Sequence, residues 1–263
     1  MNIVTNNHLE GVNSKALAKA RRKEGRLFFN LSLPSLITIL IVVFIPVFWL
    51  SSLSFFDRAG DFSWENYDRI FQSQLYIKTF IVTLKISFIT LFFCILLGYP
   101  LCYWLSQLPD RLAGILMVFV LLPFWTSILV RTYAWLVILQ RNGIINDTLI
   151  SIGWIDEPLQ LAHNLTGSII GMVHILLPFF ILPLFASMRS IDTNFIRAAI
   201  SLGSTPRGAF WRVFFKMSLP GFFAGTVLVF VLALGTYVTP ALLGGGKIQM
   251  LAQRIDSTIM LYS

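Results

Sequence analysis

Charged residues are scarce in this chain, at 12% of its 263 residues, whereas hydrophobic residues make up 56%. That balance excludes an ordinary soluble domain, in which about a quarter of the residues are charged. A helix needs roughly 20 apolar residues to cross the hydrocarbon core of a bilayer. Five segments meet or approach that length: residues 28–54, 86–108, 112–140, 164–188 and 217–243. The sequence therefore predicts an all-α, polytopic membrane helix bundle with five spans.

Acidic residues are absent from all five apolar segments. A secondary transporter that is driven by protons or Na⁺ usually needs a carboxylate within the membrane. The absence therefore disfavours that class of protein. Prolines recur within the same segments, among them Pro123, Pro178 and Pro183. Kinked and broken helices line the pathways of many transporters, so this feature mildly favours transport.

Residues that carry metal or acid–base chemistry are few and scattered. The three histidines are far apart and lack clustered carboxylates or thiols, which argues against a metal site. One of them, His174, has either a structural role or a role in proton relay. Cys94 and Cys102 lie two turns apart in one segment, cannot pair with each other, and are expected to be inert packing residues.

Nucleotide-binding and catalytic motifs are also missing. Gly246-Lys247 does not fit the phosphate-loop pattern, and no spacing of Ser, His and Asp suggests a catalytic triad. We therefore expect that the chain is not an enzyme, holds no cofactor and hydrolyses no nucleotide.

The net charge of +8 results from an uneven distribution of basic residues. If successive spans alternate in direction, the N-terminal tail, Arg111 and residues 189–216 share one side, with twelve Lys and Arg against six on the other. The positive-inside rule makes the richer side cytoplasmic. This predicts a basic cytoplasmic tail over residues 1–27 and a membrane domain over residues 28–263. The basic residues thus set the topology, and we expect no binding to nucleic acid.

The most informative segment is residues 189–217, which we call the elbow. We expect it to form two short helices that are joined by Gly203-Ser204-Thr205-Pro206. Gly203 suits a left-handed helix end, Thr205 can cap the next helix, and Pro206 fits that helix's first position. Basic side chains occur throughout the elbow: Arg189, Arg197, Arg207, Arg212 and Lys216.

The second predicted helix of the elbow is amphipathic. Its apolar side chains recur at i, i+3, i+4 and i+7, namely Phe210, Val213, Phe214 and Met217. An amphipathic bend at the cytoplasmic face of a membrane protein predicts a docking site for another protein.

Arg131 interrupts the third apolar segment. An arginine inside the membrane is costly unless it is paired or faces water, so it either has a function or extends its charge to the interface. Trp125, Tyr133 and Trp135 lie nearby and either form an interfacial aromatic belt or line a passage, where aromatic rings can hold a cation. Together with Tyr237, near the end of the last span, these residues are the candidates for lining a pathway.

The elbow resembles the conserved cytoplasmic loop of permease subunits in binding-protein-dependent ABC importers. That loop has the pattern Glu-Ala-Ala, three residues, Gly, nine residues, then an apolar-x-apolar-Pro ending. The spacing matches Arg197-Ala198-Ala199, Gly203 and residues 213–216, with Arg197 in place of the acidic residue and Lys216 in place of the proline. The resemblance implies that Arg197, Ala198, Ala199, Gly203, Pro206 and Arg207 contact a cytoplasmic ATPase, and Arg197 puts one family contact in question.

A second motif narrows the resemblance. Residues 123–135, PFWTSILVRTYAW, and residues 142–146, NGIIN, resemble the first permease subunit of spermidine/putrescine importers, with similarity from about residue 28 onward. The family has the type I ABC importer permease fold with six core spans, so we expect that this chain lacks the last of them.

The resemblance implies a permease in the inner membrane of a bacterium, which carries a small solute such as spermidine or putrescine. Its implied partners are a cytoplasmic ATPase dimer, a second homologous permease, a periplasmic solute-binding protein and the lipid bilayer. Three alternatives stay open: an importer of another small solute, a membrane scaffold that recruits a cytoplasmic partner, and a channel or secondary carrier.

Overall fold

The structure is a computed structural model that describes residue 23 and residues 29–56, 60–246 and 248–262. The basic tail predicted for residues 1–27 therefore lies outside the described residues, apart from Lys23. The described regular structure is helical, with one isolated bridge between Phe56 and Phe62. The chain divides into two compact units, Met1–Ser73 and Gln74–Ser263.

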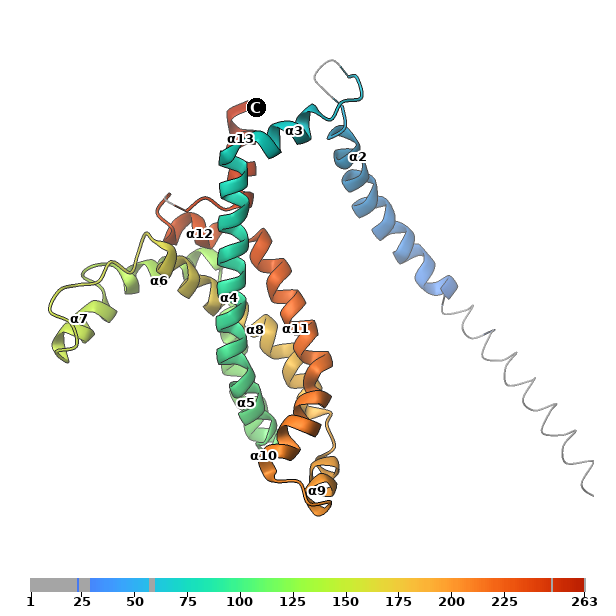
Figure 1. Cartoon of the computed structure of the whole chain (residues 1–263), viewed down its shortest axis with the longest axis vertical. Helices are drawn as coiled ribbons and strands as arrows, with labels where there is room; N and C mark the ends of the chain where they lie inside the picture. Colours follow the sequence, from blue (N-terminus) through green and yellow to red (C-terminus); the bar gives the residue numbers. More distant parts are fainter. Residues whose placement is uncertain (1–22, 24–28, 57–59, 247, 263) are drawn as a thin grey trace, which may run out of the picture. The chain divides into compact units, whose positions relative to one another are not determined.

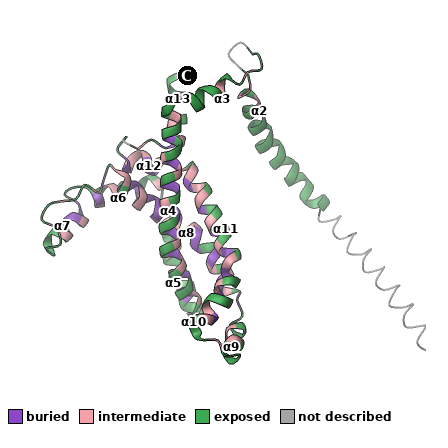
Figure 2. Cartoon of the chain, in the orientation of Figure 1, coloured by how far each residue is buried: buried purple, intermediate pink, exposed green. Residues whose placement is uncertain are grey.

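The first unit contains the first predicted span, a helix over Phe29–Leu53. None of its residues is buried, and Figure 2 shows α2 (Ile45–Leu53) exposed along most of its length. A π-helical turn, η1 (Leu40–Phe44), comes directly before α2, which carries Pro46 in its first turn. Proline has no N–H to donate, so the regular i to i−4 bonding is interrupted where the π turn lies.

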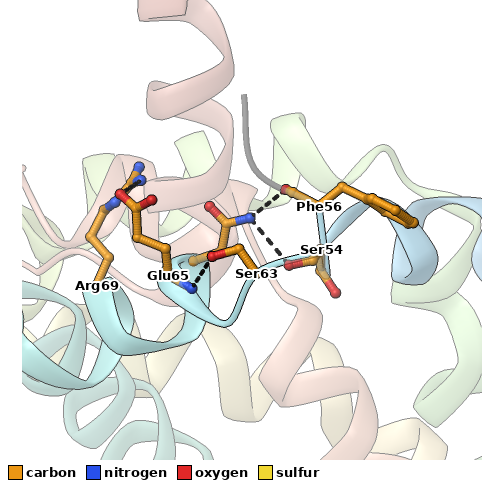
Figure 3. Close-up of polar contacts among 6 residues, drawn as sticks. Ser54, Phe56, Ser63, Glu65 and Arg69 are labelled. Carbon is orange, nitrogen blue, oxygen red and sulfur yellow. Dashed lines mark hydrogen bonds and ion pairs between the residues drawn. The ribbon is translucent and has the colours of Figure 1, made fainter. Parts of the chain in front are cut away.

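After the first span, the chain turns into the short helix α3 (Glu65–Gln72). The amide nitrogen of Asn66 donates to the carbonyls of Ser54 and Phe56, at 3.1 and 2.9 Å (Figure 3). Glu65 forms an exposed ion pair with Arg69 at 3.2 Å. The Asn66 bonds satisfy carbonyls that the end of the first helix leaves free, and so fix α3 to that end.

The second unit holds the other spans (Figure 1). Its long helices are α4 (Gln74–Ser106), α8 (Leu165–Arg189) and α11 (Phe215–Gly235), the last of which continues a helix that begins at Pro206. The shorter helices are α5 (Asp110–Leu121), η2 (Leu122–Trp125), α6 (Ile128–Leu139), α7 (Ile144–Ser151), α9 (Thr193–Ser201), α10 (Pro206–Ala209), η3 (Phe210–Phe214), α12 (Val238–Leu243) and α13 (Leu251–Tyr262).

Helix α8 is the centre of this unit and packs against both α4 and α11. Half of its apolar window is buried, and Figure 2 shows its buried residues between the two neighbours. Phe180 of α8 has no exposed surface and lies against Gly98 of α4 and Gly225 of α11. Small residues let helices approach closely within a membrane, where no hydrophobic force drives one apolar helix against another.

The five predicted spans are present with two corrections. The third span is broken, because Asp110–Trp125 and Ile128–Ser151 meet at a bend of 97°. The fifth predicted span ends at Gly235 instead of residue 243, since Thr236 is extended and α12 forms a separate helix. Pro123 and the extended Thr126 mark the break in the third span. The remaining four helices are each long and apolar enough to cross a membrane.

Helix α4 is longer than a membrane requires. Its 33 residues extend for roughly 50 Å, against roughly 30 Å of hydrocarbon. If its Ser106 end lies at one membrane surface, about the first twelve residues of α4 project beyond the other. The predicted second span, residues 86–108, is thus the part of α4 that hydrocarbon would cover.

The close approach at Phe180 gives a prediction for stability. A Cβ atom added at Gly225 would lie 2.8 Å from the Phe180 carbonyl oxygen, which cannot move without shifting α8. We expect Gly225→Ala to destabilise the protein by about 1–3 kcal/mol. Thermal unfolding in detergent would measure the loss. Gly114→Ala is the matched control, because Gly114 is also in a helix but has open space around it. Equal unfolding temperatures for both variants would contradict the packing role of Gly225.

Candidate functional site

The elbow begins with α9 and turns sharply at Gly203. Asp192 caps α9 by accepting a hydrogen bond from the backbone of Asn194 at 2.9 Å. Gly203 has a φ of +90°, a conformation that side chains rarely adopt, and Thr205 accepts a bond from the backbone of Gly208 at 3.2 Å. Pro206 then occupies the first helical position. The roles predicted for Gly203, Thr205 and Pro206 are confirmed.

The prediction of two short helices is correct only for the first. The second helix starts at Pro206 and runs without interruption to Gly235, so it is the beginning of the last span. A π-helical turn, η3, lies at its start and inserts one extra residue into the helical register. Consequently Phe214 is buried as predicted, but Ser218 takes the next buried position while Met217 is exposed.

Helix α9 presents an uncovered surface. Arg197 and Ala198 are exposed and Ala199 is half-buried. Apolar side chains surround them, with Phe195 54% and Leu202 89% exposed. Exposed apolar side chains next to small ones are typical of a surface that another protein covers. Arg197 and Arg207 form no ion pair within the described residues, so both cations are available to a partner.

Arg189, the last residue of α8, attaches the elbow to the turn between α4 and α5. Its Nη1 atom donates to the carbonyls of Ser106 and Leu108, both at 2.8 Å, and its Nη2 atom pairs with the carboxylate of Asp110. The last carbonyls of a helix have no partner within the helix. Arg189 therefore caps the end of α4 from another helix. The sequence places a basic residue at the end of a span but gives no signal of this distant partner.

Aromatic contacts attach the other end of the elbow to the same helix. The ring of Tyr103 in α4 packs edge-on against Phe210 and Phe214, with ring centroids 5.0 and 5.2 Å apart. One turn earlier, the hydroxyl of Tyr99 is 3.1 Å from that of Ser218. The Ser106 end of α4 is thus held by Arg189 before α9 and by these aromatic rings after it. We call this arrangement the α4 clasp.

Arg131 lies on α6, just beyond the break in the third span. It lines a cavity of about 380 Å³ between η2, α6, α8 and α11. Most of the other lining side chains are apolar, including Phe124, Phe179 and Val231. The Nε and Nη1 atoms of Arg131 are buried and have no hydrogen-bond partner. The residue as a whole is half-buried, so the two predicted alternatives, a function or a charge that extends to the interface, both stay open.

The aromatic candidates are not gathered at one place. Trp135 packs edge-on against His174, with centroids 5.4 Å apart, and both line a second cavity of about 550 Å³. The Nδ1 atom of His174 is buried without a partner. Trp125 and Tyr133 are 80% and 54% exposed and do not line either of these cavities.

Tyr237 lies apart from Arg131, after the end of the last span. Its hydroxyl donates to the carboxylate of Asp256 in α13 at 3.0 Å. This hydrogen bond and the negative charge of Asp256 raise the pKa of Tyr237. The contact fixes α13 to the loop before α12, and a role for Tyr237 in a pathway stays a prediction.

The NGIIN motif has a structural explanation. Asn146 is fully buried and its amide donates to the carbonyls of Gln140 and Leu159, at 3.0 and 2.9 Å. Its side-chain oxygen accepts from the backbone of Leu159 at 2.9 Å. The motif therefore holds the loop after α7 against the end of α6, and so positions α6 and Arg131.

Comparisons with known proteins agree with this arrangement. Residues 95–261 match the family described as "Binding-protein-dependent transport system inner membrane component". The spermidine/putrescine transport system permease protein PotB of Haemophilus influenzae is 33% identical over 229 residues, which cover 85% of this chain and 80% of that protein. PotB of Salmonella typhimurium is 32% identical over 215 residues, or 80% and 75% of the two chains.

A solved structure supports the fold. The structure of a bacterial alginate ABC transporter, in complex with an alginate-bound periplasmic protein, matches with a TM-score of 0.67 and 19% identity. The match covers 91% of this chain and 85% of that one. The chain therefore belongs to the family of inner membrane components of binding-protein-dependent transport systems, the multi-pass permease subunits of ABC importers, which are not enzymes.

Proposed function

We propose that this chain is the first of two permease subunits in a bacterial polyamine importer. It frames the translocation path together with the second permease, and a periplasmic binding protein delivers spermidine or putrescine. A cytoplasmic ATPase dimer holds α9 and drives transport. The observation that carries the proposal is the α4 clasp, which connects an uncovered α9 surface to the ends of two spans.

The orientation follows from the distribution of charge. Residues 189–217 and the α4–α5 turn lie at one end of the second unit, because Arg189 bonds directly to Asp110. This end carries the larger share of the basic residues when the N-terminal tail is counted with it. The positive-inside rule therefore supports a cytoplasmic elbow and N-terminus. The projecting end of α4 then faces the periplasm, where the binding protein would dock.

The cargo is supported by the relatives and by the kind of side chain among the pathway candidates. Several permeases with about a third of their residues identical to this chain serve spermidine/putrescine transport. Trp125, Tyr133, Trp135 and Tyr237 are the aromatic candidates for lining the path, and aromatic faces attract cations. The helices break at Thr126 and Thr236, and backbone carbonyls at such breaks can also receive an ammonium group.

Cargo identity can be tested on the assembly of both permeases and the ATPase in liposomes, with the binding protein added. We expect spermidine or putrescine to stimulate ATP hydrolysis and to accumulate in an ATP-dependent manner. An alginate oligosaccharide and an aminophosphonate serve as control solutes. Stimulation by a control solute alone would contradict the polyamine proposal and leave the importer assignment intact.

Docking of the ATPase can be tested at Ala198. This residue is exposed, so a tryptophan there disturbs the chain's own packing little and acts only if a partner covers the site. We expect Ala198→Trp to reduce ATPase co-purification and uptake by about tenfold or more. Ser151→Trp, an exposed position on α7 outside the elbow, is the matched control and should retain the ATPase. Normal ATPase recovery with Ala198→Trp would contradict docking at α9.

The α4 clasp predicts a different defect for Arg189. Arg189→Gln removes charge-assisted hydrogen bonds worth about 2 kcal/mol at the α4–α8 junction but leaves the α9 surface unchanged. We expect the ATPase to bind normally, while the ratio of solute imported to ATP hydrolysed falls several-fold. Arg212→Gln, an exposed arginine of the same elbow, should keep the normal ratio. An unchanged ratio in Arg189→Gln would contradict a role for the clasp in coupling.

A further inference from the structure

Arg131 has no ion-pair partner among the residues that the structure describes. Two of its three guanidinium nitrogens, Nε and Nη1, are buried and unbonded, and the residue forms no ion pair in the parts of the chain that the structure describes. The cavity in front of it is lined chiefly by apolar side chains. In such surroundings a charge interacts strongly with its neighbours and is costly without a partner.

Two features of Arg131 increase that cost. An arginine stays protonated in proteins, so it cannot escape the cost by becoming neutral. Arg131 is also in the first turn of α6, where its backbone donates to the Ser127 carbonyl at 3.0 Å. The start of a helix carries a partial positive charge, which disfavours a cation there. Both features call for an anion in the cavity.

The chain has no acidic residue that could supply this anion from its spans. The acidic residues of the second unit are Asp110 at the start of α5, Asp147 in α7, Asp256 in α13, and Asp156, Glu157 and Asp192 outside the helices. Asp110 pairs with Arg189, and Asp256 receives the Tyr237 hydroxyl. His174, whose Nδ1 is also unbonded, cannot provide a negative charge. None of the described acidic residues pairs with Arg131, which leaves its guanidinium open to an anion from another molecule.

The proposed cargo cannot supply the anion that Arg131 requires. Spermidine and putrescine are polycations, and a bare guanidinium beside their path would repel them. An anion that neutralises Arg131 removes this repulsion. Because the second permease frames the same path, its side chains are the nearest protein groups from outside the chain. This step rests on the proposed function.

We propose that a carboxylate of the second permease subunit enters the cavity between α6, α8 and α11 and forms an ion pair with Arg131. The ion pair fixes the position of one permease against the other at the break in the third span. It also neutralises the positive charge of Arg131 beside the path of a cationic solute. Planar guanidinium groups bind carboxylates with two parallel hydrogen bonds, and either unbonded nitrogen of Arg131, Nε or Nη1, can form such a pair together with Nη2. Arg131 is thus a positioning residue of the permease pair.

The test uses the full assembly of both permeases, the ATPase and the binding protein. Polyamine uptake by the wild-type assembly tests the proposed function separately. Arg131→Met leaves the partner carboxylate buried and unpaired, so we expect uptake to fall about tenfold or more while both permeases still co-purify. A second change of that carboxylate to its amide should restore uptake, because removing both charges is far less harmful than removing one. The matched control is Lys85→Met, since Lys85 is an exposed basic residue near the outer end of the second span.

The partner is identified by charge reversal. Each Asp and Glu within or beside the spans of the second permease is changed to Arg in an Arg131→Glu background, and uptake is measured. Recovery by one such change supports the proposal. Three results would overturn it: wild-type uptake by Arg131→Met, no recovery by any reversal, or recovery only on adding anionic phospholipid, which would make a lipid phosphate the counter-charge. A wild-type assembly that imports no polyamine would instead reject the proposed function.

Discussion

The attachment of both ends of the elbow to α4 is the constraint on which the rest of the second unit depends. Arg189 bonds to the last carbonyls of α4, and the Tyr103 ring packs against Phe210 and Phe214 on the far side of α9. Helix α9 makes few contacts of its own. A force applied to α9 therefore passes to the ends of α4, α8 and α11 together, and not to one helix alone.

Close packing keeps these three helices from sliding past one another. Phe180 fills the space that Gly98 and Gly225 leave open, and Gly221 lies against Ser187 two turns further along α8. Interiors packed in this way resist continuous deformation and move between discrete arrangements. A rigid three-helix core that is attached to α9 suits the proposed function, in which the ATPase holds α9 and the subunit rocks between two states. The broken third span, which carries Arg131, is the part that this core does not include.

The sequence predicted the spans, the elbow and its turn chemistry, because these depend on local rules. The length of each apolar segment can be counted directly in the sequence. The elbow turn depends on neighbouring residues only, namely the left-handed Gly203, the Thr205 cap and Pro206 at the start of the next helix. The register of the second elbow helix could not be predicted, since the π turn at residues 210–214 shifted burial from Met217 to Ser218. The 97° break and the Arg189 contact also depend on packing between distant segments.

Distance measurements between spin labels test the central claim most directly, with labels at Ser201 in α9 and Gln107 after α4, both exposed. The complete assembly would be compared in its nucleotide-free and ATP-trapped states, with a second label pair between α9 and the ATPase as a positive control. If the α4 clasp holds, the distance between Ser201 and Gln107 stays constant while the control pair changes. A change of about one helical turn, roughly 5 Å, between Ser201 and Gln107 would show that the elbow moves independently of α4 and would contradict the account.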